Sequence, residues 1–187
     1  MSDELLGRMR GGDADALDHA LRLYWPSLVS YLERWTGSPD FAEDVAQQAF
    51  LRLWDRRAEW RLAGSVRALI FRIARNLAIS EYRRLDARTR AEASYATDRP
   101  DRIDPSPLDV LESRRLEAAL EREIGALPER RREAFILRHI HGLSYREIAE
   151  IMGISEQTVA NQLSRAVVAL RRALAPLLDD EAQDDGE

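Results

Sequence analysis

The sequence predicts an all-α protein made of two small helical domains. Only nine of its 187 residues are Gly and seven are Pro, and apolar residues recur at helical spacing along most of the chain. A stretch of different composition, residues 86–113, separates the two helical parts. It holds three prolines and seven acids against four arginines, which is typical of a flexible linker. We therefore expect domains at 1–85 and 114–178, followed by a disordered acidic tail at 179–187.

The first helices are predicted from their apolar faces and their ends. One runs from about Asp13 to Tyr24 and is interrupted by Pro26. The next covers about residues 27–36 and ends at Gly37, which can adopt the left-handed backbone of a helix terminus.

A third helix is expected to begin after Ser38, because Ser is a good N-cap and Pro39 suits a first helical position. It should end at about Trp54. A long basic helix then covers about residues 66–85, with an apolar face that includes Ile70 and Ile73.

The amino-acid composition excludes several kinds of functional site. The chain contains no Cys, which excludes disulfides, Cys-ligated zinc and thiol catalysis. All of its basic residues are Arg, which excludes a Walker lysine and a Schiff-base lysine. His19, His139 and His141 share no helical face, so we expect no metal site. No catalytic motif is visible, so we expect neither an enzyme nor a cofactor nor a small-molecule substrate.

Charge and hydropathy indicate a cytoplasmic protein with local basic faces. The first ten residues lack the apolar core of a signal peptide, and no apolar run approaches the roughly 18 residues of a membrane span. The net charge is −5, but the tail at 179–187 holds six acids and the rest of the chain carries +1. Residues 60–85 hold six arginines against one acid. Such a local basic face matters more for binding DNA than the whole-chain charge does.

A helix-turn-helix motif is predicted at residues 143–172. Ser144 precedes Glu147 by three residues, which makes a capping box. Ala149, Gly153 and Val159 then fall where two closely packed helices need a small residue, a turn and a core anchor. The second helix would lie in the major groove. Its side chains positioned to meet bases and phosphates are Gln157, Thr158, Asn161, Gln162 and Arg165. The alternative is a helical hairpin that matches the pattern by accident.

A second candidate nucleic-acid surface is the basic helix and the loop before it. Aromatic faces stack on unpaired bases, and Arg holds the backbone. The alternative is that Phe71 and Tyr82 belong to the core and the arginines to a solvated face. The candidate contacts are Trp60, Arg61, Arg72, Arg75 and Asn76.

Three segments resemble the extracytoplasmic-function (ECF) group of bacterial sigma factors. Residues 41–54 are similar to that family's polymerase-binding helix, and residues 67–76 are similar to its promoter-melting helix. Residues 127–135 and 142–149 resemble its C-terminal domain. The three motifs stand in the family's order.

The resemblance implies a function and its partners. The partners would be core RNA polymerase, promoter DNA and an anti-sigma factor. The first domain would correspond to sigma region 2, and the second to the region 4 helix-turn-helix that reads the −35 element. The basic helix and its loop would bind and melt the −10 element, with Asn76 reading a flipped base. The polymerase contacts carried over from the family are Asp44, Gln47, Gln48 and Arg52. Departures include Leu69, where the family often has Trp, and Gln48, where Glu is usual.

Two other classes remain open from the residues themselves. A stand-alone helix-turn-helix regulator would bind a palindromic site as a dimer. A protein-interaction module, such as an adaptor, would leave the helix-turn-helix unexplained.

Overall fold

The computed structural model describes residues 2–60, 65–92 and 111–184, and every regular element in those ranges is a helix. The N-terminal half contains α1 (Ser2–Arg10), α2 (Ala14–Thr36), α3 (Pro39–Asp55) and α4 (Val66–Glu92). The C-terminal half contains α5 (Leu111–Ala126), α6 (Glu129–Phe135), the π-helical turn η1 (Ile136–Ile140), α7 (Tyr145–Met152) and α8 (Glu156–Asp184). The predicted all-α class is confirmed.

Helix α1, residues 2–10, is one that our prediction missed. Leu5, Leu6 and Met9 are buried, and α1 packs against α2 and α4. Their spacing places all three on one helical face, but polar residues dominate the segment and hide that face in its average composition.

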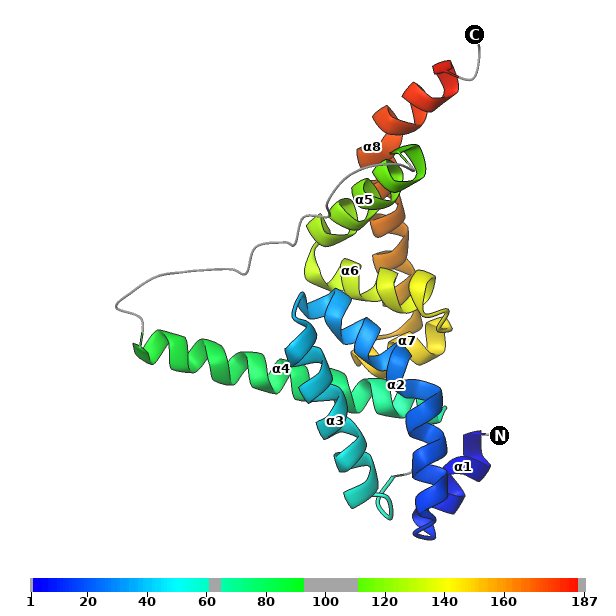
Figure 1. Cartoon of the computed structure of the whole chain (residues 1–187), viewed down its shortest axis with the longest axis vertical. Helices are drawn as coiled ribbons and strands as arrows, with labels where there is room; N and C mark the ends of the chain where they lie inside the picture. Colours follow the sequence, from blue (N-terminus) through cyan, green and yellow to red (C-terminus); the bar gives the residue numbers. More distant parts are fainter. Residues whose placement is uncertain (1, 61–64, 93–110, 185–187) are drawn as a thin grey trace.

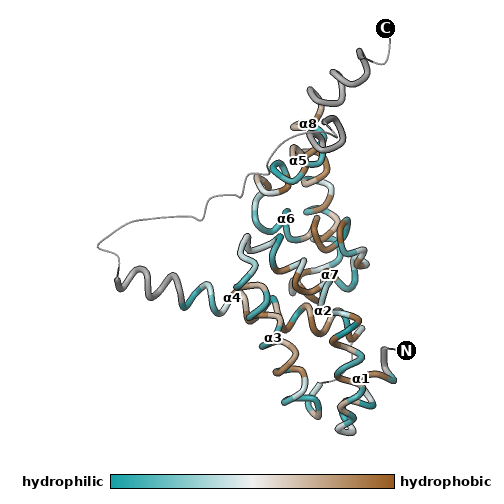
Figure 2. The backbone as a smooth tube through the Cα atoms, in the orientation of Figure 1, coloured by the Kyte–Doolittle hydropathy of each residue, from teal (hydrophilic) through white to brown (hydrophobic). Residues whose placement is uncertain are grey.

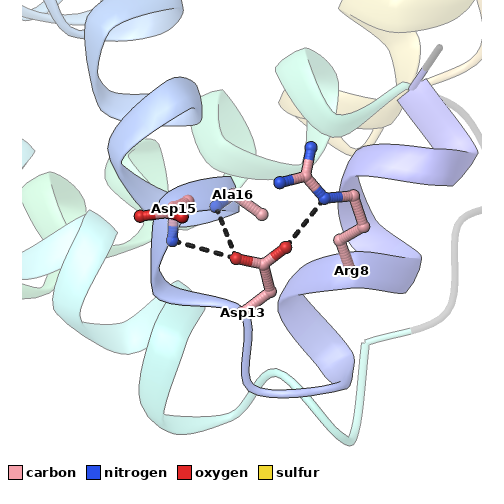
Figure 3. A network of polar contacts seen from close by, with 4 residues as sticks. All are labelled: Arg8, Asp13, Asp15 and Ala16. Carbon is pink, nitrogen blue, oxygen red and sulfur yellow. Dashed lines mark hydrogen bonds and ion pairs between the residues drawn. The ribbon is translucent and has the colours of Figure 1, made fainter.

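Asp13 connects α1 to α2 (Figure 3). One of its carboxylate oxygens accepts hydrogen bonds from the backbone N–H groups of Asp15, at 3.0 Å, and Ala16, at 3.3 Å. The other accepts one from Arg8 Nε at 2.8 Å. The hydrogen bond from Arg8 is the main reason that the pKa of Asp13 lies below its usual value. Asp13 therefore caps α2 and fixes the end of α1 beside it.

Pro26 does not interrupt α2, contrary to our prediction. The helix continues to Thr36 and bends along its length (Figure 1). A proline removes the bond to the carbonyl four residues earlier, which here belongs to Arg22. Both Arg22 and Pro26 are exposed, so water can satisfy that carbonyl. Packing of Leu28 and Leu32 holds the second half of the helix in place.

The helix ends predicted from capping residues and glycines are confirmed. Gly37 ends α2 with a left-handed φ of 77°, and the Ser38 hydroxyl caps α3. Ser144 and Glu147 form the predicted capping box of α7. Gly153 ends α7 at a φ of 67°, which turns the chain into α8.

The predicted linker and tail differ from the structure at their edges. Helix α4 continues through residues 86–92, and α5 begins at Leu111. The middle of the linker, 93–110, lies outside the described residues. Helix α8 continues to Asp184 where a disordered tail was expected, and residues 185–187 lie outside the described part of the chain.

The two halves pack against each other. Helices α5–α8 lie above α2–α4 in the view of Figure 1, with α4 against α7 and α2 against η1 and α6. Buried residues of both halves belong to one cluster. Figure 2 shows that apolar residues, in brown, recur along the helices in the part of the molecule where the two halves meet.

The burial of α1 gives a stability prediction. Leu6→Ala should lower the free energy of unfolding by about 2–5 kcal/mol, because it leaves a cavity under a side chain that is almost fully buried. Leu23→Ala is the matched control, since Leu23 is 48% exposed. Urea denaturation of both variants measures the difference. Equal, small losses would show that α1 does not pack on the core.

Candidate functional site

One face of α3 is polar and open to solvent. Asp44, Gln47, Gln48 and Arg52 are all exposed. Leu51 lies among them in the sequence and is 56% exposed. The opposite face is buried against α2 and α4 by a set of apolar residues that comprises Ala42, Val45, Ala46, Ala49, Phe50 and Leu53. The polar face of α3 is therefore accessible to a partner while its apolar face stays packed.

The two described arginines of the candidate −10 surface contact the C-terminal half. Arg72 Nη1 lies 3.1 Å from Glu150 Oε1 of α7. Arg75 donates to both carboxylate oxygens of Glu133 in α6, from Nε at 2.6 Å and from Nη2 at 3.2 Å. Asn76, the next residue along α4, is exposed. These arginines therefore do not lie on a free face in this conformation.

Glu133 lies at the centre of this contact. It is 1% exposed, and it also accepts a hydrogen bond from the Tyr31 hydroxyl of α2 at 2.9 Å. Burial, together with the nearby Glu133 carboxylate, raises the pKa of Tyr31 well above its usual value. The Arg75 guanidinium also lies 5.9 Å from the ring centroid of Trp35. Helices α2, α4 and α6 thus meet around one carboxylate.

Trp60 is anchored to α3. Its indole N–H donates to the Leu53 carbonyl at 3.2 Å, and the Arg56 guanidinium lies 5.5 Å from its ring centroid. The ring packs on the core while staying partly exposed. Arg61 lies outside the described residues. Phe71 is fully buried and belongs to the core, whereas Tyr82 is 41% exposed, so the core alternative holds for Phe71 only.

In the helix-turn-helix, the side of α8 that was predicted to contact DNA is open to solvent. The Ser155 hydroxyl accepts a hydrogen bond from the Thr158 N–H at 3.1 Å, and Val159 and Leu163 are buried. Gln157 Nε2 lies 3.4 Å from Asn161 Oδ1. The candidate recognition residues are exposed or partly exposed, and they are Gln157, Thr158, Asn161, Gln162 and Arg165.

His141, which no sequence pattern selected as a site residue, lies at the contact between the halves. His141 Nδ1 is 3.1 Å from the Ser27 hydroxyl, and Arg67 donates to the His141 carbonyl. Its Nε2 is buried without a hydrogen-bond partner among the described residues. Burial first, and then the positive charges of Arg67 and Arg34, lower the pKa of His141 to about 4. No local pattern marks this residue, because its environment comes from α2 and α4.

A second contact joins α4 to α7. The Ser65 hydroxyl donates to Glu147 Oε1 at 2.7 Å, while Glu147 Oε2 accepts from the Ser144 backbone at 3.0 Å. Burial alone would raise the pKa of Glu147, but these hydrogen bonds outweigh it and lower the pKa. Glu147, the acid of the capping box, thus also binds the N-terminal half through the Ser65 hydroxyl.

Comparisons with known proteins match both halves. A family model of sigma-70 region 2 matches residues 21–88, and one of sigma-70 region 4 matches residues 117–170. The chain is 31% identical over 182 residues to the RNA polymerase sigma-H factor of Pseudomonas aeruginosa, covering 94% of each chain. It is 29% identical to the ECF RNA polymerase sigma factor SigW of Bacillus subtilis, covering 95% of this chain and 98% of SigW.

A solved structure shares the fold. It is that of the sigma factor RpoE of Bartonella quintana in complex with the anti-sigma factor NepR, with a TM-score of 0.65 and 24% identity. The alignment covers 84% of this chain and 96% of that one. Among the described residues, no helix has the length and apolar character needed to cross a membrane.

The buried His141 gives a pH prediction. The fold favours its neutral form, so the free energy of unfolding should fall as the pH drops from about 6.5, where the unfolded histidine takes up a proton, towards about 4. His141→Asn should have a shallower decrease over this range, since an amide oxygen can still accept from Ser27 without titrating. Urea denaturation across the range gives both slopes.

The control is His19→Asn, at an exposed position, which should retain the wild-type slope. Parallel curves for wild type and His141→Asn would contradict the burial of a neutral imidazole.

Proposed function

Since this chain belongs to the ECF sigma factors of RNA polymerase, it binds core polymerase and directs promoter-specific initiation, and we propose which of its surfaces perform each step. Sigma factors are initiation factors and not enzymes. We assign polymerase binding and the −10 element to residues 1–85, and the −35 element to residues 114–178. The two family matches, one in each half, support this division.

The exposed face of α3 is the proposed polymerase contact. Four polar side chains of this face surround Leu51. The opposite, apolar side of α3 packs on α2 and α4, and that packing holds the helix in place. Leu51 would be buried at the centre of the interface, with polar groups at its rim. The proposed contacts are Asp44, Gln47, Gln48 and Arg52.

Asp44→Arg tests this face. We expect the affinity for core polymerase to fall at least about tenfold, because reversing a charge in a desolvated pair commonly costs about 2–5 kcal/mol. Circular dichroism should remain unchanged, since Asp44 is exposed. Titration of labelled protein with core polymerase measures the loss. Glu117→Arg, the same charge change at an exposed site on α5, is the control, and equal affinities for the two variants would remove α3 from the interface.

The −10 element is assigned to α4 and the loop before it. Asn76 is exposed at a position that can meet a flipped base, and extruding a base costs a few kcal/mol that a fixed contact can offset. Arg72 and Arg75 would hold the phosphate backbone once their carboxylate partners have moved away. The complete set of proposed contacts is Trp60, Arg61, Arg72, Arg75 and Asn76.

Asn76→Ala should lower open-complex formation more than it lowers duplex binding, because the contact forms only after the base has flipped. Permanganate footprinting of the holoenzyme on a promoter measures opening, and a gel-shift assay measures binding. Ser80→Ala, one turn further along the exposed face of α4, should change neither. Equal loss at both steps for Asn76→Ala would contradict a role in reading a flipped base.

The −35 element is assigned to the N-terminal part of α8. Gln157 and Asn161 carry amides, which suit adenine in the major groove, while Arg165 suits guanine or phosphate. Glu156 opens the helix and would repel nearby phosphate. Few phosphates are therefore neutralised by this domain. Useful affinity then comes from core polymerase, which holds both DNA-binding domains over one promoter.

This tethering predicts a weak isolated domain. Residues 114–178 should bind promoter duplex weakly and with a small dependence on salt, whereas the holoenzyme binds tightly and with a steep dependence. Fluorescence anisotropy at several salt concentrations measures both slopes. Tight, sequence-specific binding by the isolated domain would favour a stand-alone helix-turn-helix regulator.

An anti-sigma factor and a cytoplasmic location complete the proposal. The fold neighbour RpoE was solved bound to an anti-sigma factor, and a partner of that kind would compete for the surfaces that polymerase and DNA use. Core polymerase and the chromosome are cytoplasmic, so a protein that serves both works there.

A further inference from the structure

The first two turns of α8 hold their side chains in a fixed arrangement. Val159 and Leu163 are buried, so one side of the helix is anchored in the core. At its start, the Ser155 hydroxyl accepts a hydrogen bond from the Thr158 N–H at 3.1 Å, and the two hydroxyl oxygens lie 2.8 Å apart. The outer side of these turns is therefore a fixed platform for the residues that it exposes.

Two amides on this outer side are hydrogen-bonded to each other. Gln157 Nε2 donates to Asn161 Oδ1 at 3.4 Å, and both residues are exposed. Residues four positions apart are neighbours on a helix surface, and a Gln–Asn hydrogen bond at this spacing stabilises the helix. The two side chains therefore form one unit in which Gln157 is the donor and Asn161 is the acceptor.

This bond leaves the two amides with different free groups. Gln157 keeps its oxygen and one N–H, which are the acceptor and the donor that adenine requires at N6 and N7. Asn161 keeps both N–H donors of its amide, while its oxygen already has a donor. An amide taken singly suits adenine, but an amide that presents its donors suits guanine O6 and N7 or thymine O4.

We infer that Gln157 and Asn161 read two neighbouring base pairs as a coupled unit, in which Gln157 selects adenine and Asn161 selects guanine or thymine. This inference rests on the proposed assignment of α8 to the −35 element. Four residues of helix rise by about 6 Å, which is less than two base steps of about 3.4 Å each. The selectivity of Asn161 then depends on its neighbour, so the two bases are not read by independent contacts.

Exclusion of water makes this coupling stronger on DNA than in the free chain. Both amides are exposed in the free chain, so water competes for their hydrogen bond. In the major groove that water is displaced, and an Asn161 oxygen without a donor is then costly. Gln157 supplies a donor whatever the DNA sequence, whereas only adenine and cytosine offer an amino group there. The pair is also ordered before it binds, which lowers the entropic cost of the contact.

Gln157→Ala tests the coupling, because it removes the donor to Asn161 and leaves Asn161 in place. The assay is transcription by holoenzyme reconstituted with the full chain, on a barcoded library in which the −35 element of a transcribed promoter is randomised. Sequencing of the transcripts gives the base preference at each position. Asn161→Ala should flatten the preference at one position only, which identifies the base pair that Asn161 reads.

The expected result for Gln157→Ala is a change at two positions. The preference for adenine at the position that Gln157 reads should disappear. At the position that Asn161 reads, the preferred base should change from guanine or thymine to adenine, by about tenfold in relative transcription, because a free amide makes the bidentate contact with adenine. Circular dichroism should remain unchanged, since both residues are exposed.

Gln162→Ala is the matched control. It removes the amide of the adjacent recognition residue and keeps the bond between Gln157 and Asn161. It should affect only the position that Gln162 itself reads. If Gln157→Ala also left the preference at the Asn161 position unchanged, Asn161 would read its base independently and the inference would be overturned.

A double-variant cycle measures the coupling by affinity. On the preferred −35 element, Gln157→Ala with Asn161→Ala should lower the affinity of the holoenzyme by less than the product of the two single losses. Gln157→Ala with Arg165→Ala should give the product, because these residues lie eight positions, or about 12 Å, apart along the helix. Multiplicative losses for both pairs would also overturn the inference.

The outcomes separate the inference from the proposed function. If each single variant changes the preference at its own position alone, α8 reads the −35 element and only the coupling fails. If no variant of Gln157, Asn161 or Arg165 changes a −35 preference while the holoenzyme still initiates, the assignment of α8 to this element fails, and the inference fails with it.

Discussion

The buried carboxylate of Glu133 is the constraint on which the arrangement of this molecule depends. An ionised group in that environment is destabilising by several kcal/mol unless its partners are in place. Here the partners are the Tyr31 hydroxyl and the Arg75 guanidinium, from two different helices of the other half. Helix α6 can satisfy this carboxylate only in one position against α2 and α4. The contacts of Arg72 with Glu150 and of Ser27 with His141 then follow at the same interface.

This constraint also bears on the chain's charge pattern. The chain carries a net charge of −5, and two of its acids pair with the two arginines that α4 would offer to DNA. The recognition side of α8 and the polar face of α3 are exposed in the same conformation. The packing of the two halves therefore covers one of the three proposed binding surfaces and leaves the other two accessible.

The features predicted correctly from the sequence are helix ends, which are determined by residues close together in the chain. Ser38, Gly37 and the Ser144–Glu147 capping box each fix a helix end within a few residues of themselves, and all three were confirmed. The surfaces assigned to polymerase and to the −10 and −35 elements were read from local motifs and remain predictions.

The sequence could not reveal contacts whose two sides lie far apart in the chain. Arg75 and Glu133 are 58 residues apart, and a periodic pattern shows which face a residue occupies but not which partner it meets. Pro26 was misjudged because the packing of Leu28 and Leu32 outweighs the local cost of a proline. Helix α1 was missed because only three of its residues are apolar and buried.

The most direct test is the distance between the two halves before and after polymerase binds. Spin labels at Asp18→Cys in α2 and Arg171→Cys in α8, both exposed, occupy the only two cysteines of the chain. Double electron–electron resonance should give one narrow distance for the free protein and a different, longer one for the holoenzyme on promoter DNA. A broad distribution in the free protein, or the same distance in the transcribing complex, would contradict the account.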